Sequence, residues 1–87
     1  MKLCILYHPK GEYATQTEQF AEECKRISSQ PIELISLETP SGASLASVYD
    51  VVDYPAMLVI REDGQLNKGW QGGGFPSVEE VVGYLNN

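Results

Sequence analysis

Two cysteines, a tyrosine and a histidine are the side chains of this sequence best suited to chemistry. Cys4 and Cys24 stand twenty residues apart, and Tyr7 and His8 follow shortly after Cys4. A thiolate is a nucleophile, two thiols can form a disulfide, and an imidazole can transfer protons or bind metal. These residue types raise the hypotheses of thiol exchange, acid–base catalysis and metal ligation.

The spacing of these residues argues against a metal site. His8 is the only histidine of the chain. On a strand it would lie about 13 Å from Cys4, which is too far for both to bind one ion. A zinc site needs three or four converging ligands, and the sequence offers no such group. We therefore expect no metal, and we expect no other cofactor.

Both cysteines fall in apolar surroundings. Cys4 lies within the apolar run Leu3–Tyr7, and Cys24 shares a helical spacing with Phe20, Ala21 and Ile27. Burial raises the pKa of a thiol and slows its reactions, so each cysteine is expected to act as a small apolar side chain. A redox pair of Cys4 and Cys24 stays open, because a helix packed on the strand could bring the thiols together.

Four strands and three helices are predicted from apolar spacing and turn residues. The strands are expected at Lys2–Tyr7, Ile32–Leu37, Ala56–Ile60 and Gln65–Gln71, with a hairpin turn at Asp63-Gly64. The helices are expected at Thr15–Ile27, Ala43–Tyr49 and Ser77–Leu85. Capping boxes predict the start of the first helix at Thr15 and of the last at Ser77.

The order β-α-β-α-β-β-α defines the expected architecture. A strand–helix–strand unit implies a parallel pair with a right-handed crossover, and the hairpin adds an antiparallel strand. Residues 1–87 are therefore expected to form a single α/β domain. Its mixed four-stranded sheet should be flanked by helices on both faces.

Charge and composition exclude several partner classes. The net charge is −6, and the six basic residues are scattered along the chain. Such a chain repels phosphate groups, so we expect no nucleic-acid partner and no membrane surface as partner. The apolar run at the N-terminus is too short for a signal-peptide core or a membrane span. A cytoplasmic location with reduced thiols is the expectation.

Two stretches resemble proteins of the thioredoxin-like superfamily. Tyr49–Gly64 is similar to the segment in which a helix ends, a proline follows, an apolar strand runs and a charged glycine turn closes a hairpin. Gly69–Leu85 is similar too, with glycines after the last strand and a final amphipathic helix. The resemblance covers nearly the whole chain. It implies a thioredoxin-like fold, a cis bond before Pro55, and a Tyr54 backbone that faces the functional loop.

The chain departs from that superfamily at its reactive motif. Thioredoxins carry Cys-x-x-Cys after the first strand, where the N-terminus of a helix lowers the thiol pKa. Residues 8–15 read His-Pro-Lys-Gly-Glu-Tyr-Ala-Thr and contain no cysteine. Without a thiolate at this position no mixed disulfide can form there. The sequence therefore predicts a redox-inactive member.

Three functions from different classes remain. The first is a protein- or peptide-binding module that uses His8, Pro9, Tyr13, Tyr54 and Pro55, with an extended peptide pairing beside the Tyr54 backbone. The second is an atypical thiol- or glutathione-dependent redox protein that uses Cys4, Cys24 or Tyr7, because a tyrosine near that position activates glutathione in similar folds. The third is a regulatory or assembly subunit that uses a sheet edge. The oligomeric state is left open.

Overall fold

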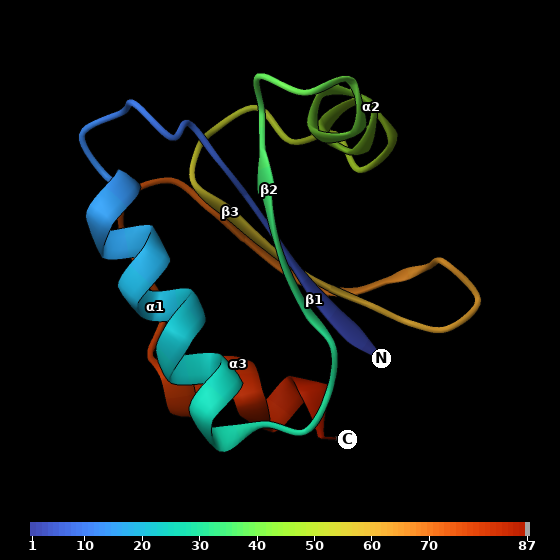
Figure 1. Ribbon diagram of the computed structural model, residues 1–87. Helices are drawn as coiled ribbons and strands as arrows, with labels where there is room; N and C mark the ends of the chain where they lie inside the picture. The colour runs from blue at the N-terminus through green and yellow to red at the C-terminus, as the bar shows by residue number, and fades with distance from the viewer. Residues whose placement is uncertain (87) are drawn as a thin grey trace.

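Four strands and three helices follow one another along the chain in the predicted order β-α-β-α-β-β-α. The computed structural model describes residues 1–86 (Figure 1). The strands are β1 (Lys2–Tyr7), β2 (Ile32–Ser36), β3 (Ala56–Ile60) and β4 (Leu66–Gln71). The helices are α1 (Ala14–Ile27), α2 (Pro40–Val48) and α3 (Val78–Leu85). The α/β architecture expected from the sequence is confirmed.

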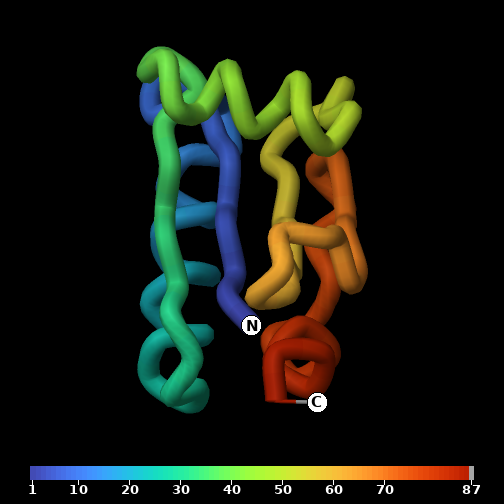
Figure 2. The backbone as a smooth tube through the Cα atoms, turned by 90° about the vertical axis from the view of Figure 1, so that its right-hand side faces the viewer, coloured from blue at the N-terminus to red at the C-terminus, as the bar shows by residue number. Residues whose placement is uncertain are grey.

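The strands form a mixed four-stranded sheet in the order β2-β1-β3-β4. Figure 2 shows them side by side, with α2 crossing the upper end of the sheet. β1 runs parallel to β2, as the crossover through α1 requires. β3 is antiparallel to both β1 and β4. β1 and β3 are therefore the central strands, and their side chains are buried almost without exception.

Helices cover both faces of the sheet (Figure 1), and the alternation of strand side chains divides the core between them. On one face, Leu3 and Ile5 of β1 pack with apolar side chains of α1 and α3. On the other face, Cys4 and Leu6 pack with Ala46 of α2. The predicted placement of helices on both faces is confirmed.

α1 begins earlier than the predicted capping box allows. Its first residue is Ala14, and Tyr13 occupies the N-cap without a capping bond from its side chain. The chain already turns at Gly11, whose amide donates to the His8 carbonyl at 2.9 Å and whose carbonyl accepts from Ala14 at 3.2 Å. Thr15 thus lies inside the first helical turn, and the prediction of a cap at Thr15 is wrong.

α2 begins three residues before its predicted start, at Pro40. Thr39 is its N-cap, and the Thr39 hydroxyl accepts from the Gly42 amide at 3.1 Å. A proline just after such a residue favours a helix start, because its fixed φ suits the first turn. Gly42 lies against the Ser36 carbonyl so closely that a Cβ would collide with it. This contact holds α2 at the end of β2.

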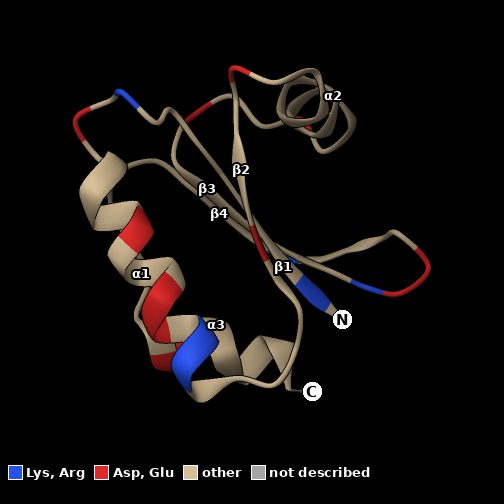
Figure 3. Cartoon of the chain, in the orientation of Figure 1, with Lys and Arg blue, Asp and Glu red and all other residues tan. Residues whose placement is uncertain are grey.

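Charged residues lie mainly on the outer side of α1 and in the loops, as Figure 3 shows. Strands β1 and β3 have almost none between their ends, which matches their burial on both faces. Among residues 1–86, no helix has the length and apolar character that crossing a bilayer requires.

Candidate functional site

Three loops meet at the end of β1 and enclose a cleft. β1 and β3 pair Leu6 with Ala56, so the loop after β1 begins where the loop before β3 ends. β3 and β4 pair Ala56 with Gln71, which brings the glycine loop after β4 to the same place. These loops come together at the upper left of Figure 1. The cleft between them has a volume of about 560 Å³.

Four of the five predicted binding residues line this cleft. They are His8, Tyr13, Tyr54 and Pro55, which come from two loops far apart in the sequence. Pro9, the fifth, is half-buried in the loop after β1 and is not part of the cleft wall. The antiparallel pairing of β1 with β3 is what brings the two loops together.

The Tyr54–Pro55 bond is cis, and Pro55 is buried at the base of the cleft. The Pro55 carbonyl accepts from the Gly72 amide at 2.9 Å, which extends the β3–β4 pairing into the loop. The ring of Tyr54 meets the His8 ring edge-to-face, with 5.1 Å between the ring centroids. The contact joins the loop before β3 to the loop after β1.

The loop before β3 is held by side-chain hydrogen bonds. The Gln71 side-chain oxygen accepts from the amides of Val52 at 3.0 Å and Asp53 at 3.2 Å. The Asp53 carboxylate accepts from the Tyr54 amide at 3.0 Å. The Tyr54 hydroxyl donates to the Val51 carbonyl at 3.3 Å. These hydrogen bonds hold the loop beside the cleft. The Tyr54 amide already has an acceptor, the Asp53 carboxylate.

Tyr13 forms another part of the cleft wall. Its carbonyl accepts from both the amide and the hydroxyl of Thr17, at 2.9 and 2.7 Å, and Thr17 is fully buried. The Tyr13 side chain is 38% exposed. It lies against Gly73, where a Cβ would come within 2.5 Å of the ring. Any residue other than glycine at position 73 would therefore push the Tyr13 ring out of its present position.

Tyr7 lies at the floor of the cleft and is nearly buried. Its hydroxyl donates to the Glu18 carboxylate at 3.0 Å. Burial, and next the hydrogen bond to Glu18, raise the pKa of the Tyr7 phenol above its ordinary value. Its proton is directed at Glu18, whereas a tyrosine that activates a thiol must direct its hydroxyl at that thiol.

Cys4 and Cys24 lie on opposite faces of the sheet. Cys4 packs on the α2 side, whereas Cys24 packs between α1 and the sheet on the other side. Both are fully buried, and both thiols are free. Burial raises the pKa of Cys24 to about 11 and raises that of Cys4 as well. The redox pair that the sequence left open would have to join two thiols that pack in different core clusters, on opposite sides of the sheet.

Four further residues line the cleft that the sequence patterns did not single out as binding residues: Glu12, Thr17, Asp53 and Gly73. The run of three glycines at 72–74 contained a usable signal, because such a run permits close backbone approach as well as a turn. Within residues 1–86, no group of three metal-ligating side chains comes together.

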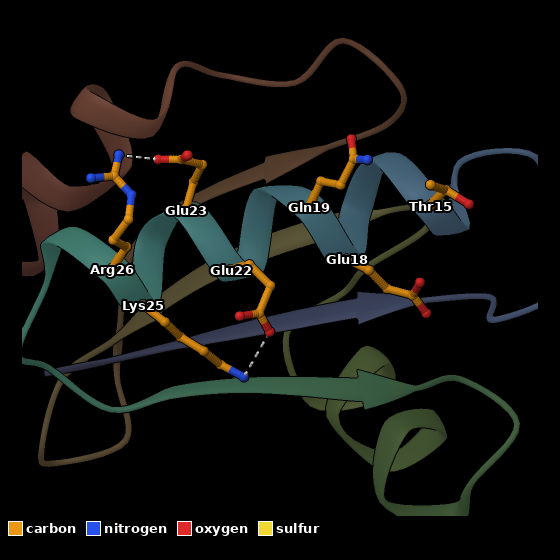
Figure 4. A pocket seen from close by; sticks show the side chains of 7 residues that line it. All are labelled: Thr15, Glu18, Gln19, Glu22, Glu23, Lys25 and Arg26. Carbon is orange, nitrogen blue, oxygen red and sulfur yellow. Dashed lines mark hydrogen bonds and ion pairs between the residues drawn. The ribbon is translucent and has the colours of Figure 1, made fainter.

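A broader hollow of about 810 Å³ runs along the outer side of α1. Every side chain that lines it comes from this one helix (Figure 4): Thr15, Glu18, Gln19, Glu22, Glu23, Lys25 and Arg26. Glu22 pairs with Lys25 at 3.8 Å, and Glu23 pairs with Arg26 at 2.6 Å. With no second wall, this surface is a solvated helix face rather than a binding cleft.

Comparisons with known proteins support the fold alone. No protein-family model and no curated protein sequence matches the chain. Among solved structures, it is similar to thioredoxin 1 from the thermophilic eubacterium Thermosipho africanus, with a TM-score of 0.72 and 15% identity over 99% of this chain and 91% of the other. A malarial protein is similar at a TM-score of 0.71 and 12% identity, over 98% and 92% of the two chains. The fold is thioredoxin-like.

Proposed function

We propose that this thioredoxin-like domain is non-catalytic and binds a peptide segment of a protein partner in the cleft. The observation that carries the proposal is the cleft itself, in which Tyr13 and Tyr54 offer partly exposed rings beside the cis-proline loop. Aromatic side chains at the centre of an interface contribute much of its affinity. No cysteine lies in the loop after β1, so a bound peptide would not be linked by a disulfide there.

Side-chain contacts should contribute more than backbone pairing. β-addition beside Tyr54 would require its amide, which already donates to Asp53. A peptide would have to displace that carboxylate before it could accept the same hydrogen bond. The rings of Tyr13 and Tyr54 need no such exchange, because each is already placed by the protein.

No observation favours the redox alternative. The thiols of Cys4 and Cys24 are buried on opposite sides of the sheet, and the Tyr7 hydroxyl donates to Glu18. Assembly through a sheet edge would use β2 or β4, which are the outer strands. That role stays a prediction, and sedimentation at increasing concentration tests it.

Selection from a displayed library of random dodecapeptides tests the proposal. Peptides that bind the protein are expected, and the double variant Tyr13→Ala/Tyr54→Ala should bind them at least about 30-fold more weakly. The matched control is Ile27→Ala/Leu66→Ala, which removes two exposed apolar side chains outside the cleft. Thermal melts confirm that both variants fold. Unchanged binding by the tyrosine variant, or no selected peptide at all, contradicts the proposal.

A further inference from the structure

The charge of the cleft indicates what kind of peptide side chain it accepts. Glu12 and Asp53 contribute carboxylates to its wall, and no lysine or arginine lines it. Within residues 1–86 neither carboxylate forms an ion pair, although four other ion pairs are present. Glu18, which accepts from the Tyr7 hydroxyl, lies on the outer side of α1 and is not part of the cleft wall. The cleft therefore presents negative charge that the chain itself does not neutralise.

Aromatic rings accompany these carboxylates. Tyr13 and Tyr54 line the same cleft, and the face of a tyrosine ring attracts a cation. The attraction is stronger where the cation is partly removed from water, as between the walls of a cleft. His8 also lines it and meets Tyr54 edge-to-face, so the tyrosine ring is held in place before a ligand arrives.

The molecule contains a cation among aromatic rings elsewhere. The Lys68 ammonium lies 5.8 Å from the centroid of the Trp70 ring and 5.9 Å from that of Tyr84. There the chain supplies its own cation. The cleft has aromatic rings and carboxylates, but no lysine or arginine of the chain lines it.

We propose that the cleft binds an arginine or lysine side chain of the partner peptide, with the cation against Tyr13 and Tyr54 and near Asp53 and Glu12. This inference rests on the proposed function and specifies its ligand. Arginine should bind more tightly than lysine, because a planar guanidinium both stacks on a ring and forms two hydrogen bonds to a carboxylate.

Binding of matched peptide pools tests this inference. The probes are random dodecapeptide pools with a fixed central arginine, lysine, citrulline or glutamate, measured by fluorescence anisotropy. Citrulline has nearly the shape of arginine but carries no charge, so it isolates the cation. The arginine pool should bind at least about tenfold more tightly than the citrulline pool, which equals about 1.4 kcal/mol. The glutamate pool should bind most weakly.

Two further variants test whether the preference for arginine depends on the carboxylates of the cleft. In Glu12→Gln/Asp53→Asn both charges are lost, while the side chain at position 53 can still accept from the Tyr54 amide. This variant should lose most of the preference for arginine over citrulline. The control Glu22→Gln/Glu23→Gln removes the same charge from the outer side of α1 and should keep the preference.

The outcomes separate this inference from the proposed function. Equal binding of the arginine and citrulline pools, still lost in Tyr13→Ala/Tyr54→Ala, would overturn the inference and leave the peptide-binding cleft intact. A preference for arginine that survives in Glu12→Gln/Asp53→Asn would also overturn it. Binding of none of the pools would overturn both.

Discussion

The outer side of α1 and the cleft at the end of β1 hold carboxylates in different surroundings. On the helix, Glu22 and Glu23 each have a basic partner three residues later (Figure 4). In the cleft, Glu12 and Asp53 have aromatic neighbours and no basic partner among the described residues. On a helix, residues three or four apart in sequence are neighbours, so Glu22 and Glu23 meet basic side chains of the same helix. The cleft instead brings together residues from three separate loops. A surface whose charges are already paired is poorly suited to recognise a charged ligand.

The largest expected effect concerns Cys24, which α1 buries against the sheet. If α1 stays packed on the sheet, it holds Tyr13 in place at the cleft and keeps the Cys24 thiol away from solvent. At pH 8 a thiol with a pKa of about 11 is about 0.1% ionised, against about 9% for the ordinary value of 9.0. Cys24 should therefore react with iodoacetamide at least about a hundredfold more slowly in the folded protein than in urea. Intact mass measured over time checks this.

Cys4 serves as the internal control, because it is equally buried on the other face of the sheet. The same samples kept in glutathione redox buffers should show no loss of two protons at any physiological potential. Fast labelling of Cys24 alone would mean that α1 opens and cannot hold Tyr13 steady. A reversible disulfide would restore the redox hypothesis.

The second prediction concerns the glycine loop. In Gly73→Ala the new methyl group would come within 2.5 Å of the Tyr13 ring, so the ring must move and affinity for a selected peptide should fall about tenfold. Gly74→Ala is the matched control, because a Cβ there meets no atom within 4 Å. Fluorescence anisotropy on both variants measures the difference. Equal affinities would show that the position of Tyr13 does not matter.

The third prediction uses salt to compare the cleft with the outer side of α1. Raising the salt concentration from 0.1 to 1 M shortens the screening length from about 10 to about 3 Å. Affinity for the arginine pool should fall by about threefold or more, and affinity for the citrulline pool should change much less. The ion pairs of α1 are exposed and already screened by water, so the unfolding free energy should respond only weakly to salt. A salt-insensitive preference for arginine would contradict the role of the carboxylates.

The smallest expected effect concerns the hydrogen bond between Tyr7 and Glu18, which joins β1 to α1 below the cleft. Tyr7→Phe should reduce the unfolding free energy by about 1 kcal/mol, because it removes one partly buried hydrogen bond. The raised pKa of Tyr7 means that this contribution is complete below about pH 10 and is lost at higher pH. Urea unfolding of both proteins at pH 7 and above pH 10 measures it.

If the two proteins differ in stability by the same amount at every pH, the phenol does not titrate as the structure implies. Glu18→Gln is the companion variant, because it keeps an acceptor for the Tyr7 hydroxyl while removing the charge. It should cost less stability at pH 7 than Tyr7→Phe.

The sequence by itself determined the order of elements, their apolar faces and the class of fold. Strand and helix periods are local properties, so the run at Lys2–Tyr7 and the spacing of Val78–Leu85 were sufficient to predict β1 and α3. The sequence also showed directly that residues 8–15, where thioredoxins carry Cys-x-x-Cys, contain no cysteine. The start of α1 was missed, because the turn at Gly11 begins the helix before Thr15 can cap it.

Only the tertiary structure decided which side of the sheet each cysteine occupies and which side chains form the cleft. Cys4 and Cys24 each looked apolar, but the parity of β1 places them on opposite faces. Asp53 and Gly73 reach the cleft because β3 and β4 pair from Ala56 to Gln71, a contact between residues distant along the chain. The apolar periodicity of a segment indicates which of its side chains are buried. The register between strands decides which loops meet, and hence which side chains line the cleft.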